Sequence, residues 1–221
     1  SCKLSGLSGA KYWNDLDSVI QIVPYASPCH GNVPYNGFGF QYPKSGNSYC
    51  LADFLCNICA PGSYRTYIKN RLKSKLIFNT VYCVKFHVNI GNNSTYGISS
   101  IGAYFGDNSL DTIKAAHVPL TYLTPQIENP NSNMITDTLN WSVISGTFTS
   151  SGNEKFMLIG NFKSNQATNK ILINPNNLPG IFTTVSVDDV SCIPIDLPAY
   201  AGPNKSCVPG DSVYLGRPRD V

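Results

Sequence analysis

The sequence predicts an all-β protein, folded as a two-sheet antiparallel sandwich of the jelly-roll type. Several short segments alternate apolar and polar residues or are rich in β-branched residues, and turns of Gly, Asn, Pro and Ser separate them. The sequence has no long helical pattern beside them, and short strands without such helices are typical of a sandwich. With 221 residues, the chain is long enough for one such domain with a sizeable core.

The clearest strand covers residues 80–90, with the sequence TVYCVKFHVNI. One face carries Cys83, Lys85, His87 and Asn89. The other face is apolar and consists of Tyr82, Val84, Phe86, Val88 and Ile90. This period of two predicts a strand that turns one face to the core and the other to solvent.

Four further segments are predicted as strands, at residues 99–105, 140–148, 154–162 and 182–192. The segment 154–162, EKFMLIGNF, is apolar on both faces, which is typical of a central strand.

Residues 64–76, YRTYIKNRLKSKL, fit either an amphipathic helix or a strand. As a strand, the segment would direct Arg65, Lys69 and Arg71 outward. We favour the strand because the surrounding segments are all β.

The composition limits the classes of partner. Charged residues make up 13% of the chain, about half the usual ~25%, which is common in secreted β proteins. The net charge of +3 is too small to predict nucleic-acid binding. No apolar run approaches the ~18 residues of a membrane span, so the chain is not expected to span a membrane.

Eight cysteines predict an oxidising compartment and disulfide bonds. A zinc site is the alternative, but the C-x-x-C of Cys56 and Cys59 has no second pair to complete four ligands. Eight cysteines allow 105 full pairings, so the connectivity is mostly open.

Two statements about the cysteines are specific. Cys2 and Cys29 are predicted to pair, which would stabilise the fold by about 3–4 kcal/mol in the loop-entropy model. Cys207 is predicted not to pair within this domain, for example with Cys192, because it lies beyond a Pro-rich joint.

A series of segments carries a family resemblance. In order, they are AKYWN, VPYNGFGFQYPKSGNSYC, YRTYIKNRL, TVYCVKFHV, IGAYF, LTPQIENP, TDTLNWSVISGTF, LIGNF and VDDVS. The series resembles an N-terminal module of large secreted Bacteroidota proteins that carry a type IX secretion or gliding-motility-associated C-terminal domain. The resemblance covers about residues 1–197. Residues 198–221 resemble a linker and the first strand of an immunoglobulin-like module, so we expect a piece of a larger exported protein, clipped at both ends.

The resemblance also implies a function. The module is similar to galactose-binding-like carbohydrate-binding modules of the jelly-roll kind, which implies glycan binding or adhesion by a secreted or outer-surface protein. Its implied partners are a polysaccharide or surface glycan and the downstream domains of the same polypeptide. A structural spacer that binds nothing is the alternative.

The sequence does not predict an enzyme, and a secreted hydrolase is the distant alternative. The three histidines are scattered, and Asp188–Asp189 is the only adjacent pair of carboxylates. Neighbours on a strand point to opposite faces, so this pair would not flank one glycosidic bond.

The resemblance gives the Asp pair another role. In the related carbohydrate-binding modules the last strand often ends in an acidic residue that binds a structural calcium ion. Here either Asp188 or Asp189 would supply one inward carboxylate, depending on the register, and Gly46 and Asn47 in the loop 45–49 would supply carbonyl oxygens. The alternative is that the Asp pair caps a strand end and faces water.

The candidate sugar-binding residues are aromatic, because aromatic rings stack on the apolar face of a pyranose. Trp13, Tyr25, Tyr35 and Phe38 lie in long loop-like stretches, where binding residues are common. For Trp13 and Phe38 the alternative is that they pack the loops down, and for Trp13 we favour it. Trp141, at the start of a predicted strand, is expected in the core.

A basic group adds a second candidate surface. Five of the sixteen basic residues lie between positions 65 and 75. If Arg65 shared an outward face with Lys85 and His87 on a neighbouring strand, that face would attract an acidic polysaccharide. A solvated face that blocks edge pairing is the more common role of such a row.

Four triplets of Asp, a hydroxyl residue and an apolar residue are similar to the O-glycosylation signal of exported Bacteroidota proteins. The acceptors are Ser18, Thr112, Thr138 and Ser212, of which Thr112 and Thr138 are expected to be the most accessible. Asp-Ser and Asp-Thr are also ordinary turn and capping pairs.

Overall fold

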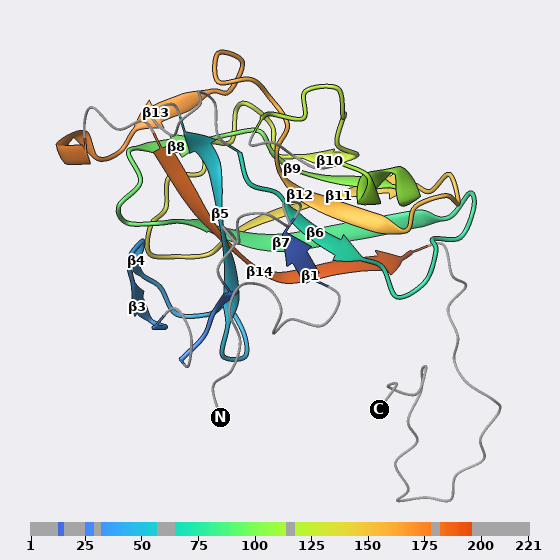
Figure 1. Cartoon of the computed structure of the whole chain (residues 1–221), viewed down its shortest axis with the longest axis horizontal. Coiled ribbons are helices and arrows are strands. Elements are labelled where there is room, and N and C mark those ends of the chain that lie inside the picture. Colours follow the sequence, from blue (N-terminus) through green and yellow to red (C-terminus); the bar gives the residue numbers. More distant parts are fainter. Residues whose placement is uncertain are drawn as a thin grey trace, which may run out of the picture.

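The computed structural model describes residues 13–15, 25–28, 32–56, 65–113, 118–177 and 182–195. Two five-stranded antiparallel sheets dominate these residues (Figure 1). The predicted antiparallel sandwich is therefore confirmed. The predicted immunoglobulin-like strand and its linker, residues 198–221, lie outside the described residues.

The first sheet has the strand order β1-β6-β12-β9-β10. Its strands are β1 (Trp13–Asp15), β6 (Ile68–Arg71), β12 (Phe156–Asn161), β9 (Ile101–Gly106) and β10 (Ile127–Glu128). The second sheet has the order β11-β7-β14-β5-β2. Its strands are β11 (Ser142–Thr149), β7 (Val81–Ile90), β14 (Phe182–Pro194), β5 (Tyr49–Cys56) and β2 (Tyr25–Ala26).

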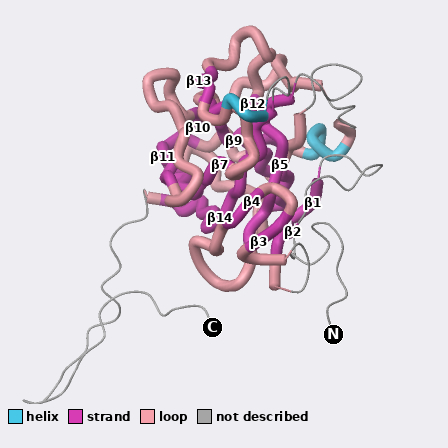
Figure 2. Tube along the Cα trace, turned by 90° about the vertical axis from the view of Figure 1, so that its left-hand side faces the viewer, coloured by secondary structure: helices cyan, strands magenta, loops and turns pink. Residues whose placement is uncertain are grey.

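Two short ribbons and two short helices complete the described elements. The ribbons are the hairpin of β3 (Tyr35–Asn36) with β4 (Gly39–Phe40), and the pair of β8 (Tyr96–Ile98) with β13 (Lys170–Leu172). The 3₁₀ helices are η2 (Asn108–Asp111) and η3 (Pro175–Asn177). Figure 1 shows the hairpin at the left, and Figure 2 looks at the molecule from that side, so that β3 and β4 face the viewer.

The main core lies between the two sheets. All five residues of the predicted apolar face of β7 are buried in it, together with residues of β5, β9, β12 and β14. Every residue of β12 is buried, and β12 pairs with β6 on one side and β9 on the other. Both the alternating strand and the central strand are therefore confirmed.

The outer face of the first sheet is covered by the chain between β9 and β10. Leu110 and Leu120 pack there in a second core with Tyr67. The Tyr67 hydroxyl accepts from the Leu120 amide at 2.9 Å and donates to the Asn161 carbonyl at 2.9 Å. Gly160 leaves room for the Tyr67 ring, because a Cβ there would lie about 2.4 Å from it.

The segment 64–76 contains the favoured strand, β6, but the predicted direction of Arg65 is wrong. Arg65 precedes β6 and is only 2% exposed, and burial lowers the pKa of its guanidinium to about 10. The shared basic face is also wrong, because β6 belongs to the first sheet whereas Lys85 and His87 lie on β7 of the second. The two sheets turn their inner faces to each other, so their outer faces point apart.

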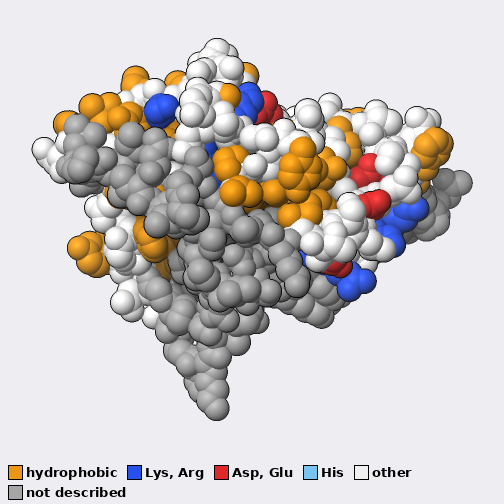
Figure 3. All heavy atoms as spheres, turned by 45° about the horizontal axis from the view of Figure 1, so that its top comes forward, with side chains coloured by type: hydrophobic (Ala, Val, Ile, Leu, Met, Phe, Trp, Pro, Cys, Tyr) orange, Lys and Arg blue, Asp and Glu red, His pale blue; other side chains and the backbone are white. Residues whose placement is uncertain are grey.

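The described residues show few charges on the face of the molecule that Figure 3 presents. Uncharged polar groups and hydrophobic side chains cover most of the described surface in Figure 3. Within the described residues, no helix has the length and apolar character that a membrane span requires.

Candidate functional site

The hairpin of β3 and β4 presents aromatic rings to solvent. Tyr35 and Phe40 stand opposite each other in its register, so their side chains share a face. Tyr42 follows, and its ring meets that of Phe40 edge-to-face with 5.3 Å between the centroids. Tyr35, Phe40 and Tyr42 are 71%, 46% and 62% exposed. Large rings are usually buried where a fold allows it, so three exposed neighbours indicate a surface with another use.

Trp141 completes this surface from another part of the chain. Its indole nitrogen donates to the Tyr42 carbonyl at 3.0 Å. A groove of about 440 Å³ lies between residues 40–44 and residues 139–141. The expectation that Trp141 lies in the core is confirmed only in part. Its half-buried ring packs edge-to-face on Tyr49 of the small core, but Trp141 also lines the groove.

Asn92 holds the two sides of the groove together. Its side-chain oxygen accepts from the Phe40 amide at 2.6 Å, and its side-chain nitrogen donates to the Thr138 carbonyl at 3.2 Å. On the second side, Asp137 accepts from the amides of Leu139 at 2.8 Å and Asn140 at 2.7 Å. These hydrogen bonds lower the pKa of Asp137, and the one from the Asn140 amide has the largest effect. The turn brings Asn140 and Trp141 to the groove.

Asp188 anchors the loop that leaves the groove. Its carboxylate accepts from the amides of Lys44 at 2.8 Å and Ser45 at 3.3 Å. Burial raises the pKa of Asp188, although these hydrogen bonds work against it. Because Asp188 stands opposite His87 in the register of β14 and β7, the loop lies over the outer face of the second sheet.

The prediction that Asp188 and Asp189 point to opposite faces is wrong. The register of β14 shifts between Asp188 and Ser191, and Asp189 has a left-handed backbone with a φ of 50°. This bulge turns both carboxylates toward the same loop, where the Ser45 hydroxyl donates to Asp189.

The loop 45–49 lies beside the Asp pair, as the calcium prediction requires. The contacts there are amide and hydroxyl donors of Lys44 and Ser45, while Gly46 and Asn47 are exposed. Among the described residues, no three His, Cys, Asp or Glu side chains gather closely enough to hold a metal ion. Calcium at this position stays a prediction.

The aromatic candidates separate into three groups. Tyr35 lies in the exposed aromatic surface. Phe38 packs on the small core of Ala26, Tyr49 and Leu51, so the packing alternative is confirmed for it. Trp13 and Tyr25 lie in β1 and β2 instead of in loops, since their backbones pair with Asn70 and Cys50. Of the basic candidates, Lys85 is exposed and His87 is half-buried beside Asp188. Burial is the main cause that lowers the pKa of His87, and the positive charge of Lys44 lowers it further.

The cysteines do not form a complete disulfide framework. Cys56 is disulfide-bonded, but Cys50, Cys83 and Cys192 are free thiols. The predicted bridge between Cys2 and Cys29 lies outside the described residues, as do Cys59 and Cys207.

The glycosylation sites differ in exposure. Thr112 is exposed directly after η2, where its hydroxyl donates to the Ser109 carbonyl at 2.7 Å. Thr138 is half-buried beside the groove. Ser18 and Ser212 lie outside the described residues, and glycosylation of all four stays a prediction.

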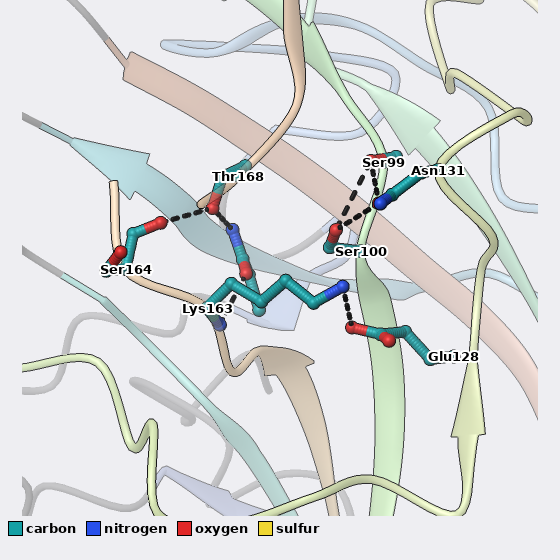
Figure 4. Close-up of polar contacts among 8 residues, drawn as sticks. Ser99, Ser100, Glu128, Asn131, Lys163, Ser164 and Thr168 are labelled. Carbon is teal, nitrogen blue, oxygen red and sulfur yellow. Dashed lines mark hydrogen bonds and ion pairs between the residues drawn. The ribbon is translucent and has the colours of Figure 1, made fainter. Parts of the chain in front are cut away.

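A second polar cluster lies around the ends of β9, β10 and β12 (Figure 4). Lys163 and Glu128 form an ion pair at 3.2 Å, and the hydroxyls of Ser99 and Ser100 each donate to Asn131 at 3.3 Å. The ion pair and the contacts of the hydroxyl groups each join neighbouring connections of the first sheet, so we assign them a structural role.

Comparisons with known proteins give similarities in fold only. No family model matches the sequence, and no curated protein is similar to it in sequence. The chain is similar to the CBM22-1 xylan-binding domain of Paenibacillus barcinonensis Xyn10C, with 10% identity, a TM-score of 0.47 and coverage of 90% of this chain and 93% of that one. The K1 cleaved adhesin domain of Lys-gingipain from Porphyromonas gingivalis W83 has 11% identity, a TM-score of 0.43 and coverage of 83% and 90%. The C-terminal family 22 carbohydrate-binding module of Clostridium thermocellum Xyn10B has 8% identity, a TM-score of 0.42 and coverage of 87% and 92%.

Proposed function

We propose that the chain is a non-catalytic extracellular module that binds a glycan in the groove beside the β3–β4 hairpin. The observation that carries this proposal is the group of aromatic rings around the groove, those of Phe40, Tyr42 and Trp141, with Tyr35 next to them. Aromatic faces stack on the apolar faces of pyranose rings, and an open groove accepts a chain of sugars.

Polar groups beside the rings suit hydroxyl-rich ligands. Asn140 is exposed and donates to Asp137 at 3.1 Å through its side-chain nitrogen, which leaves its side-chain oxygen as an acceptor. Lys44 brings an exposed ammonium group to the same groove. Amide and ammonium groups at the edge of aromatic platforms supply orientation, while the rings supply contact area.

The groove is also preformed in the absence of a ligand. The hydrogen bonds from Asn92, Trp141 and Asp188 hold its two sides and the loop that follows. A preformed site loses little conformational entropy on binding, which favours affinity for a weakly hydrophobic ligand such as a sugar. The low charge and the disulfide-bonded Cys56 support a secreted or outer-surface location, where such a module would serve in glycan binding or adhesion.

The proposal can be tested with a glycan array and with native gels that contain soluble polysaccharides. The wild-type protein should be retarded by at least one polysaccharide. Tyr42→Ala should weaken the affinity for it by about tenfold, which corresponds to about 1.4 kcal/mol, because one stacking platform is lost. Tyr122→Ala is the matched control, since Tyr122 is 68% exposed and does not line the groove.

Two results would contradict the proposal. One is a wild-type protein that binds no glycan on the array and is not retarded in any gel, which would favour a structural spacer. The other is a Tyr42→Ala variant that binds as tightly as the Tyr122→Ala variant.

A further inference from the structure

A second pocket lies at the other end of the sandwich, and the proposed glycan site does not use it. It has a volume of about 480 Å³ and is lined by residues 70–77, by Tyr82 and Met157, and by the end of β14. The hairpin lies beside the end of β7, where the Asn93 amide donates to the Phe38 carbonyl, whereas this pocket lies where β7 begins. In Figure 1, β3 and β4 lie at the left, and the chain turns from β6 into β7 at the right.

The floor of this pocket is apolar. Leu76, Tyr82 and Met157 line it, and all three are buried in the protein. The Tyr82 hydroxyl already accepts from the Ile77 amide at 3.0 Å. Val190, Cys192 and Pro194 of β14 add further apolar surface. Leu76, Tyr82 and Met157 close the floor, and the half-buried Val190, Cys192 and Pro194 supply the apolar surface that a ligand can contact.

The rim of the pocket is cationic. Arg71, Lys73 and Lys75 line it, and all three are exposed. Its described lining contains no Asp or Glu. Lys69, two residues earlier, differs because it forms an ion pair with Asp111 at 3.1 Å. Three exposed cations on the rim of a pocket whose described lining has no carboxylate attract an anion.

Ile77, which lines the pocket, and Phe78, which follows it, extend the apolar surface along the same connection. Ile77 and Phe78 are 58% and 75% exposed, directly after the basic residues. The connection from β6 to β7 thus carries cations in its first half and exposed apolar side chains in its second half.

From this arrangement we infer that the pocket binds an anionic amphiphile, a long-chain fatty acid or a lipid of the same chemistry. The alkyl chain lies on the apolar floor, and the carboxylate meets Arg71, Lys73 and Lys75. The volume falls within the range of about 300–1,000 Å³ that is usual for ligand pockets. Burial of the alkyl chain supplies affinity, and the cations supply selectivity for the charged head.

The lining argues against two other occupants. A polysaccharide would need exposed aromatic platforms, and the one ring in the described lining, that of Tyr82, is buried. A second copy of the chain would bring the same cations face to face, which is unfavourable for association.

A dansyl-labelled undecanoic acid tests the inference by fluorescence titration of the full chain. We expect saturable binding of the acid and at least about tenfold weaker binding of its methyl ester, because the ester has no charge for the cations to attract. The Lys73→Glu/Lys75→Glu variant should bind the acid at least about tenfold more weakly. Both substituted residues are exposed, so circular dichroism and the melting temperature should stay unchanged.

The control is Lys85→Glu/Lys170→Glu, which changes the net charge equally at two exposed positions outside the pocket. This variant should bind the acid as the wild type does. Equal affinity for acid and ester, equal loss in both double variants, or displacement of the probe by polyglutamate would each overturn the inference. Binding of the acid by the Tyr42→Ala variant should be unchanged, which separates this site from the glycan groove.

Discussion

Glu154 is a buried carboxylate that makes a specific contribution to stability. Its two oxygens accept from the Ser150 hydroxyl at 2.6 Å and from the amide and hydroxyl of Ser151 at 2.9 and 2.8 Å. Burial works to raise its pKa, but these hydrogen bonds outweigh burial and hold the pKa below its ordinary value of 4.5. A carboxylate of this kind stabilises the fold above its unfolded pKa, and the stabilisation is lost as the pH falls through the lower folded pKa.

We therefore expect Glu154→Gln to lower the free energy of unfolding by about 1–3 kcal/mol at pH 7, because one amide oxygen cannot replace two carboxylate oxygens. The difference from wild type should shrink as the pH falls below 4.5, as urea unfolding at several pH values can measure. Glu128→Gln is the control, since the partly exposed ion pair with Lys163 is worth at most about 1 kcal/mol. A cost for Glu154→Gln that stays constant down to acid pH would contradict the assignment.

At the scale of the elements, the bulge in β14 controls a loop that lies far away in the sequence. Asp188 accepts from the amides of Lys44 and Ser45, and this loop follows Tyr42 of the groove. We expect Asp188→Ala to speed hydrogen exchange at these two amides and to weaken glycan binding, because the loop loses its anchor. Exchange measured residue by residue by NMR checks this, and unchanged protection would rule out the anchor.

The same experiment examines calcium at Asp188 and Asp189. If calcium stabilises the loop, excess EGTA should lower the melting temperature of the wild type and should also speed exchange at Lys44 and Ser45. Asp111→Ala is the control for Asp188→Ala, because it also removes one carboxylate, but an exposed one that pairs with Lys69 on the first sheet. If the melting temperature stays unchanged in EGTA, the calcium prediction is wrong, and Asp188 acts only as a hydrogen-bonding anchor.

At the scale of the whole molecule, the free thiols report on the integrity of the sandwich. Burial raises the pKa of Cys50 to about 12 and that of Cys192 to about 11, with smaller contributions from Asp188 and from Cys83. The thiolate is the reactive form, so both residues should resist iodoacetamide at pH 8 while the protein is folded.

After denaturation without a reductant, peptide mapping should find Cys50, Cys83 and Cys192 alkylated and Cys56 unmodified. Cys56 is the internal control, because its disulfide blocks alkylation until a reductant is added. Alkylation of Cys50 in the folded protein as rapid as in the denatured protein would contradict the burial that the sandwich gives it.

The local pattern of the sequence predicts much of this fold. The alternation from Val81 to Ile90 indicates β7 and its buried face, and the unbroken apolar run of β12 indicates a central strand. Both follow from a period of two, which is a property of neighbouring residues and needs no knowledge of the partner strand. The aromatic candidates before β5 follow from a different signal, their place in loop-like stretches, and of these Tyr35 is exposed whereas Phe38 packs on the small core.

The sequence by itself determines an all-β chain with few charges, because composition, propensity and period are local. The tertiary structure alone decides that Trp141 reaches Tyr42 and that Arg65 is buried, because both depend on segments about 100 residues apart. It also decides that a bulge turns Asp189 toward Ser45, since a register shift depends on pairing between strands. The groove forms only where the hairpin meets the chain before β11, so packing, and not pattern, selects its residues.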